Sequence, residues 1–261
     1  MGILNVTPDS FSDGGRFLDA NAAIAHARRL IAEGADILDI GGESTRPGAE
    51  PAAAVDEIER VVPVIEQIRR ECDLPMSVDT MKPAVARAAV GAGATMWNDV
   101  TALGGSPESL TVAAGLGCEV VLMHMQGEPR TMQKRPRYDD VVAEVAAFLK
   151  ARAEAAIAAG VAREKIWVDP GFGFGKTPAH NIALIRGLSE IAALGFPVVV
   201  GVSRKSSIPK IAGDRSTTDQ RLGGSIALAL AAARAGAAML RVHDIAETKQ
   251  ALAVAAAIGD A

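Results

Sequence analysis

Polar residues follow nearly every short apolar run of this 261-residue chain, at the points where predicted strands would end. These strand-end residues are Asn5, Thr7, Glu43, Ser44, Thr45, Arg46, Asp79, Thr80, Asn98, Asp99, His124, Asp169, Ser203, Arg204, Lys205, Arg241, His243 and Asp244. A single Asp or Asn after a strand is most often the N-cap of the next helix. Their repetition, and carboxylates inside apolar runs at Asp39 and Asp79 that would be costly unpaired, favour a shared binding site instead.

The types of these side chains indicate a ligand with two different ends. Asp79, Asn98 and Asp169 supply acceptors and an amide that suit neighbouring N–H donors of an aminopyrimidinone ring. The donors suited to phosphate are Arg46, Arg241 and His243. The combination predicts a small heterocycle that carries phosphate.

The segment DPGFGFGK, residues 169–176, resembles a nucleotide-binding loop but fails both common patterns. A P-loop needs a glycine five residues before its Gly-Lys-Thr, and Pro170 stands there without an amide hydrogen to offer. Lys176 occupies the place of the third glycine in the dinucleotide pattern. Asp169 is therefore expected to serve another ligand.

Three other kinds of catalytic site are disfavoured. Sugar clefts are rich in aromatic side chains, whereas this chain has 3%. The histidines His26, His124, His180 and His243 are scattered, so hydrogen-bonding roles are expected rather than zinc ligation. Residues 201–205 lack the second glycine of a nucleophile elbow.

Composition and charge limit the partners. A formal charge of -4 and a pI of about 5.6 argue against a surface for nucleic acid. No apolar run reaches the length of a membrane span, and the start MGILNV has Val6 where a myristoylation signal needs Ser or Thr. With Cys72 and Cys118 expected as free thiols, the sequence predicts a cytoplasmic protein without membrane attachment.

Strand and helix signals alternate along the whole chain. The predicted strands are 3–7, 37–42, 76–80, 96–100, 120–124, 166–171, 198–204 and 239–244. Alanine-rich stretches between them, such as 22–35 and 141–160, have helical spacing. Strict alternation predicts an α/β fold, a single (β/α)8 TIM barrel over residues 1–261, whose carboxyl strand ends converge on one mouth.

Several long motifs, in order, resemble those of the dihydropteroate synthase family from end to end. They are GILNVTPDSFSDGG (2–15), DIGGESTRPGA (39–49), SVDT (77–80), ND (98–99), LMHMQG (122–127), DPGFGFGK (169–176), GVSRKS (201–206), GGS (223–225) and RVHD (241–244). One departure is clear, because the N-terminal hairpin that usually caps the barrel bottom looks absent or truncated. Pterin-binding methyltransferases share the aspartate and asparagine positions, so they remain an alternative, as does a non-catalytic pterin-binding protein.

The resemblance implies that 4-aminobenzoate displaces diphosphate from 7,8-dihydropterin-6-ylmethyl diphosphate, giving 7,8-dihydropteroate. The implied pterin diphosphate residues are Thr45, Asp79, Asn98, Met123, Asp169, Lys205, Arg241 and His243. The implied 4-aminobenzoate residues are Phe11, Thr45, Pro47, Phe174 and Ser206. The implied catalytic residues are Asn5, Arg46, Lys205, Arg241 and His243. The resemblance further implies Mg²⁺ on Asn5 and on phosphate oxygens, a homodimer, and loops 5–15 and 41–50 that close over the diphosphate.

A Schiff-base aldolase that uses Lys205 is a rival of another class. Such a lysine lies in an apolar pocket that lowers its pKa, whereas Lys205 follows Arg204 among polar neighbours. That contrast favours the transferase.

Overall fold

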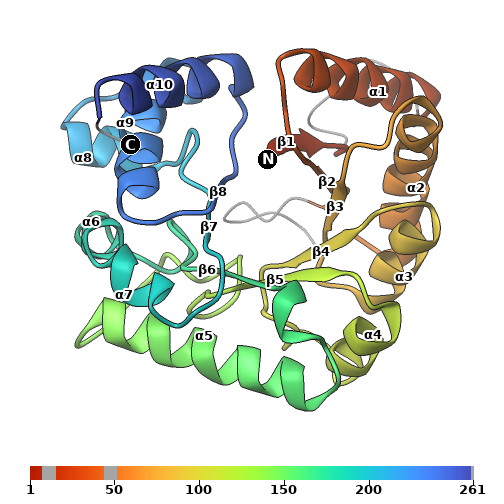
Figure 1. The fold of residues 1–261 in the computed structure, drawn as a ribbon, viewed down its shortest axis with the longest axis horizontal. Coiled ribbons are helices and arrows are strands. Elements are labelled where there is room, and N and C mark those ends of the chain that lie inside the picture. The colour runs from red at the N-terminus through yellow and green to blue at the C-terminus, as the bar shows by residue number, and fades with distance from the viewer. Residues whose placement is uncertain (8–15, 44–51, 260–261) are drawn as a thin grey trace.

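The computed structural model describes residues 1–7, 16–43 and 52–259, and shows a ring of helices around parallel strands (Figure 1). The strands are β1 (Gly2–Asn5), β2 (Leu38–Gly41), β3 (Met76–Asp79), β4 (Met96–Asp99), β5 (Glu119–Met123), β6 (Ile166–Asp169), β7 (Val199–Val200) and β8 (Met239–Leu240). Each lies within a predicted strand or overlaps it closely. The last two are the shortest.

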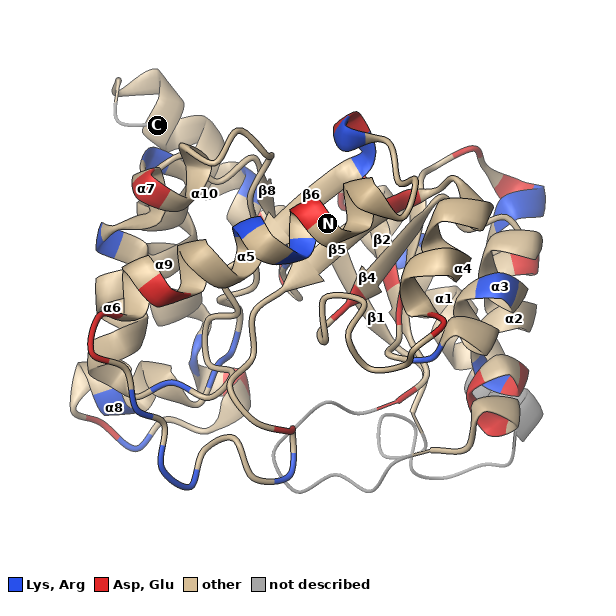
Figure 2. Cartoon of the chain, turned by 90° about the horizontal axis from the view of Figure 1, so that it is seen from below, with Lys and Arg blue, Asp and Glu red and all other residues tan. Residues whose placement is uncertain are grey.

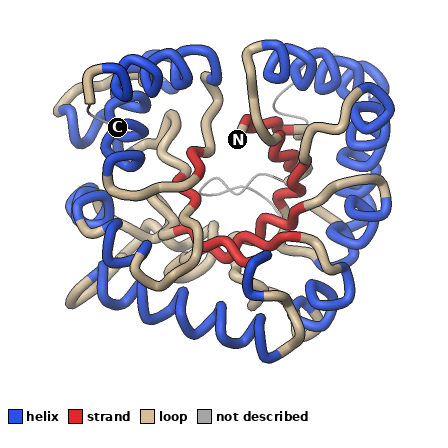
Figure 3. The backbone as a smooth tube through the Cα atoms, in the orientation of Figure 1, coloured by secondary structure: helices blue, strands red, loops and turns tan. Residues whose placement is uncertain are grey.

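The strands close into a barrel. Strands β1 to β6 form one parallel sheet in sequence order, and β7 pairs with β8. Bridges between Val168 and Val198 and between Gly2 and Val242 join the two sheets at both seams. At the second seam the Ile3 amide donates to the Val242 carbonyl at 2.9 Å. The predicted (β/α)8 barrel is confirmed, and Figure 3 shows the strands inside the helical ring.

The helices follow the strands as the alternation predicts. They are α1 (Arg16–Ala32), α2 (Ala54–Glu71), α3 (Pro83–Gly91), α4 (Ser109–Leu116), α5 (Val141–Ala158), α6 (Pro178–Arg186), α7 (Leu188–Ala192), α8 (Ser207–Ala212), α9 (Leu222–Arg234) and α10 (Ile245–Ala257), with 3-10 turns η2 (Arg163–Lys165) and η3 (Thr218–Gln220). Asp140 caps α5 by accepting from the amides of Val142 and Ala143, which the free N–H groups of a first turn require.

Side chains alternate between the two faces of each strand, and this alternation divides the core. Leu38 and Ile40 of β2 are fully buried in the layer between strands and helices, so Asp39 between them faces the barrel interior. A second apolar cluster is formed by residues in the strands or directly before them: Met1, Ile37, Met96, Val121, Trp167, Val199 and Met239. The interior is thus apolar toward the amino ends of the strands and polar toward their carboxyl ends.

The outer helices carry charges of both signs. Figure 2 shows residues of both signs on these helices. On α2, acidic residues lie in the first turn and Arg69 and Arg70 in the last, in the order that the helix dipole favours. Among the described helices, none is both long enough and apolar enough to cross a membrane.

Candidate active site

A pocket of about 340 Å³, a volume that includes the open solvent at its mouth, lies at the carboxyl ends of the strands. Its lining comes from β3, β4, β5 and β6 and from the segments that follow β4, β6, β7 and β8: Asp79, Asn98, Val100, Met123, Asp169, Gly171, Phe172, Phe174, Gly201, Lys205 and Arg241. The structure therefore brings together these sequence-predicted residues: Asp79, Asn98, Met123, Asp169, Phe174, Lys205 and Arg241.

Arg241 connects three strands at the base of the pocket. Its Nε donates to Asp39 Oδ2 at 2.5 Å, and its second terminal nitrogen donates to Asp79 Oδ2 at 2.8 Å. The Asn98 amide also donates to Asp39 Oδ2, at 3.2 Å. Asp39 is completely buried and was not assigned to the site from sequence; its position inside an apolar run was the available signal.

Burial raises the pKa values of two carboxylates that line the pocket. It raises the pKa of Asp79 to about 7, although the Arg241 charge acts in the opposite direction. Burial also raises the pKa of Asp169. Within the described part of the chain, Asp79 Oδ1 and Asp39 Oδ1 are buried and accept no hydrogen bond. Acceptors of this kind favour a ligand that presents N–H donors.

Lys205 extends over the ring of Phe174, with 4.2 Å from its Nζ to the ring centre. Burial, followed by repulsion from Arg241, lowers the pKa of Lys205 to about 8. The expectation that polar neighbours would distinguish Lys205 from an aldolase lysine is therefore wrong, because desolvation outweighs the nearby carboxylates. The surroundings of Lys205 therefore do not distinguish a transferase from a Schiff-base aldolase.

The loop after β6 folds back on the loop after β5. Asp169 Oδ1 accepts from the Gly171 amide at 2.6 Å, and Gly171 has a φ of 68°. A Cβ atom on Gly171 would lie 1.9 Å from the His124 carbonyl oxygen, and one on Gly175 would lie 2.5 Å from that of Gln126. These glycines, expected to let the backbone approach a ligand, are required by the contact between the two loops.

The buried side chain of Lys176 links these two loops by hydrogen bonds. It is 2% exposed, and its Nζ lies 3.0 Å from His124 Nδ1 and donates to the Phe174 carbonyl at 2.9 Å. Burial and the Lys176 charge lower the pKa of His124 to about 3, so the ring is neutral and its Nδ1 accepts from Lys176. The histidine at the end of β5 thus supports the loops and does not line the pocket.

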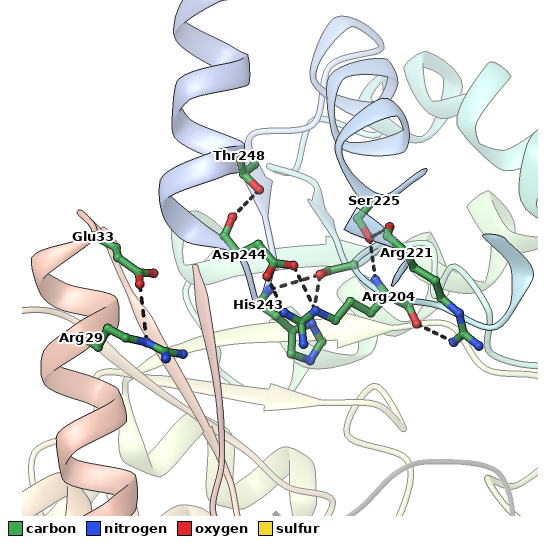
Figure 4. A network of polar contacts seen from close by, with 9 residues as sticks. Arg29, Glu33, Arg204, Arg221, Ser225, His243, Asp244 and Thr248 are labelled. Atoms are coloured by element: carbon green, nitrogen blue, oxygen red, sulfur yellow. Dashed lines mark hydrogen bonds and ion pairs between the residues drawn. The ribbon is translucent and has the colours of Figure 1, made fainter. Parts of the chain in front are cut away.

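The prediction that all the polar strand ends line one pocket is wrong for several of them, among which are Asp99, His124 and Asp244. Asp99 accepts from the amides of Thr101 at 2.7 Å and Leu103 at 3.0 Å, and so holds the turn after β4. Asp244 pairs with Arg204 (Figure 4). Asp99 is thus used locally, as Asp residues in turns often are, whereas Asp244 pairs with a residue 40 positions earlier in the chain and does not cap α10 with its side chain.

Other predicted residues lie near the mouth but not in the pocket lining. His243 Nδ1 lies 3.0 Å from Ser203 Oγ, and burial followed by the Arg241 charge lowers the pKa of His243 to about 3. Asn5 ends β1 beside Gly41, and Ser206 is exposed at the N-cap of α8. The predicted residues Phe11, Thr45, Arg46 and Pro47 lie outside the described residues, as do most of the two loops expected to close.

Comparison with known proteins identifies the family. The sequence model of the pterin binding enzymes matches residues 1–243, and the chain belongs to this family. Dihydropteroate synthase of Escherichia coli K12 is 47% identical over 254 residues, which cover 97% of this chain and 89% of that protein.

Two solved structures from Xanthomonas albilineans share the fold. Dihydropteroate synthase with 4-aminobenzoic acid matches with a TM-score of 0.93 and 52% identity, and covers 100% of this chain and 93% of its own. The same enzyme in complex with 7,8-dihydropteroate matches with a TM-score of 0.89 and 49% identity, over the same shares of both chains. The family expected from the motifs is confirmed, and an aldolase is thereby disfavoured.

The contact between the two loops generates a stability prediction. We expect Gly171→Ala to lower the free energy of unfolding by about 1–2 kcal/mol for the left-handed backbone and a further ~1–3 kcal/mol for the overlap with the His124 carbonyl. Gly213→Ala is the matched control, because Gly213 has a φ of 72° but no heavy atom within 4 Å of an added Cβ. Urea unfolding measures both variants, and equal losses would show that the contact costs nothing.

Proposed function

We propose that the chain condenses 7,8-dihydropterin-6-ylmethyl diphosphate with 4-aminobenzoate, giving 7,8-dihydropteroate and diphosphate in folate biosynthesis. It is a transferase, as its family relatives are. The observation that carries the proposal is the buried group of acceptors in the pocket, Asp79, Asn98 and Asp169, facing the Lys205 ammonium. The complexes of the related enzyme with 4-aminobenzoic acid and 7,8-dihydropteroate support both substrate classes.

The pterin ring takes the deep end of the pocket in this proposal. Asp169 accepts from a ring N–H and the amino group, while Asp79 and Asn98 bind the rest of the polar edge. Lys205 donates to the ring carbonyl, and Arg241, held in place by Asp79, covers one face of the ring. Each partner is already fixed by the protein, so little ordering remains to be done when the ligand binds.

The reaction exchanges one bond for another at the pterin methylene. The carbon–oxygen bond to diphosphate breaks, the amine nitrogen forms the new carbon–nitrogen bond, and that nitrogen then loses a proton to solvent. An aromatic amine is a neutral nucleophile at pH 7, so no general base is obligatory. The protein's task is to hold the ring and to stabilise the departing charge.

His243 is suited to donate to the departing diphosphate. Its lowered pKa keeps the ring neutral. Ser203 Oγ accepts from the His243 amide at 3.2 Å and lies 3.0 Å from Nδ1. We propose that the hydroxyl donates to Nδ1, which leaves the ring proton on Nε2. Arg46 is proposed as the second donor.

The aminobenzoate is proposed to lie toward the rim. Phe174, at the pocket wall, offers an apolar surface, and Ser206 at the exposed start of α8 is a donor for the carboxylate. The remaining proposed contacts are Phe11, Thr45 and Pro47.

Mg²⁺ is proposed as the ion that accompanies the diphosphate. The described residues contain no cluster of three His, Cys, Asp or Glu that could enclose a metal, which suits an ion held mainly by phosphate oxygens and water. Asn5, at the carboxyl end of β1, would supply the protein ligand. The ion would neutralise charge on the leaving group.

A homodimer in the cytoplasm is the proposed working form. Val254 and Ile258 lie one turn apart at the end of α10 and are 57% and 70% exposed, which supports an apolar contact between copies. Cys72 and Cys118 are both unpaired, as is usual in a reducing compartment.

The direct test is incubation with the pterin diphosphate, 4-aminobenzoate and Mg²⁺, followed by detection of dihydropteroate. We expect turnover, and a loss of about 1–3 kcal/mol of pterin binding in Asp169→Asn, because an amide donor would then face a ring N–H. Asp140→Asn is the control, since Asn also caps a helix. Calorimetry gives the affinities; no product from folded protein would refute the function, and unchanged affinity in Asp169→Asn would remove Asp169 from the site.

The pH dependence of pterin binding follows from Asp79. Its pKa is raised to about 7 in the free protein, and a ligand N–H binds the ionised form, so affinity should fall as pH drops below 7, approaching tenfold per unit. In Asp79→Asn this part of the slope should disappear, although affinity is lower throughout. Calorimetry between about pH 5.5 and 8 makes the comparison. The same slope in both proteins would contradict the assignment.

A further inference from the structure

Arg204 has a backbone conformation that side chains disfavour. Its φ is 56°, in the left-handed region, and it shares a positive φ with two other non-glycine residues of the described chain, Ala102 and Leu103. Non-glycine residues stay in this region only where their surroundings hold them, and such positions cluster at functional sites. The contacts of Arg204 therefore bear on function.

Three residues at the starts of α9 and α10 hold Arg204 (Figure 4): Ser225 in α9, and Arg221 and Asp244 just before α9 and α10. Its amide donates to Ser225 Oγ at 2.9 Å, and its carbonyl accepts from the Arg221 guanidinium at 3.0 Å. Its own guanidinium is bidentate on Asp244, with Nε at 3.0 Å from Oδ2 and the terminal nitrogen on Oδ1. Ser225 Oγ in turn donates to the Arg221 carbonyl at 2.7 Å, so Arg204, Ser225 and Arg221 form a closed ring of hydrogen bonds.

The next residue is Lys205, whose ammonium lies in the pocket. Arg204 directs its side chain to Asp244 at the start of α10, while Lys205 directs its own over Phe174. The side chains of Arg204 and Lys205 thus point in different directions, toward Asp244 and toward the pocket. The backbone conformation of Arg204 determines the angle between these directions. None of Arg204, Arg221, Ser225 and Asp244 lines the pocket.

We propose that Arg204, Ser225, Arg221 and Asp244 form a lock, here called the Arg204 lock, that fixes the left-handed turn and so positions the Lys205 ammonium for the pterin. Arg221 and Asp244 are then positioning residues that act through Lys205 and touch no substrate. The inference rests on the proposed function in one respect, that Lys205 binds the pterin.

The chain offers a matched control for the ion pair. Arg28 and Glu71 form an equally bidentate pair between α1 and α2, at 2.8 and 2.6 Å, away from the pocket. Removing the charge of Glu71 changes the same kind of interaction without affecting Lys205. Glu71→Gln is therefore expected to leave pterin affinity unchanged.

A double-mutant cycle tests the lock on pterin affinity. Asp244→Asn keeps the shape of the side chain but removes its charge, and we expect affinity to fall about tenfold. In a Lys205→Met background the same substitution should change affinity less than twofold, because the residue it acts through is gone. Arg221→Met, which removes the donor to the Arg204 carbonyl, should behave alike and serves if Asp244→Asn folds poorly. An equal loss in both backgrounds, or no loss at all, would overturn the proposal.

A second measurement needs no substrate and so separates this proposal from the function. Lys205 labelling by an amine-reactive reagent, followed by mass spectrometry across pH, reports how buried the ammonium is. In the wild type and in Glu71→Gln we expect the lowered labelling midpoint, while in Asp244→Asn and Arg221→Met it should move toward that of an ordinary lysine. Unchanged Lys205 labelling in both lock variants would overturn the positioning role even if the enzyme were fully active.

Discussion

The ion pairs of Arg241 with Asp39 and Asp79 are the interaction on which the rest of the site depends. The two carboxylates lie on neighbouring strands, 202 and 162 residues before Arg241 in the chain, and Arg241 reaches them only because the barrel closes between β8 and β1. Three charges in the interior are costly to desolvate, and each needs the others. The same contacts leave one oxygen of each carboxylate without a partner among the described residues, and of the two residues Asp79 lines the pocket.

Around this centre the polar strand ends serve two purposes. Some line the pocket, while others hold the surrounding loops in place and are here called the frame residues. Lys176 and His124 tie together the loops after β5 and β6, and Arg204 with Asp244 ties together the segments after β7 and β8. The frame residues are neutral or paired within the protein, so they do not compete for the ligand.

Much of this could be predicted from sequence. Alternation of apolar runs and helical stretches gave the eight strands and the barrel, because the periodicities of strands and helices are local properties. The strand ends then indicated Asp79, Asn98, Asp169 and Arg241, which the structure brings into one pocket.

The rest depends on partners that a sequence does not reveal. The role of Asp39 required knowing which cation reaches it, and the functions of His124 and Asp244 depended on Lys176 and Arg204. The predicted strand 198–204 is reduced to Val199–Val200, and the chain then turns at Arg204, whose left-handed backbone depends on contacts far along the chain. The lowered pKa of Lys205 likewise follows from burial, which neighbours in sequence do not determine.

The central claim is that Arg241 both completes the fold and forms the pocket, and Arg241→Met tests it most directly. Unfolding free energy and pterin affinity should be measured on the same preparation, together with Arg241→Met/Asp39→Asn. We expect Arg241→Met to lose about 3–5 kcal/mol of stability at neutral pH, because it leaves buried carboxylates without their cation, and to lose pterin binding. The double variant should regain part of the stability and none of the binding. Wild-type stability together with wild-type pterin affinity in Arg241→Met would contradict the claim.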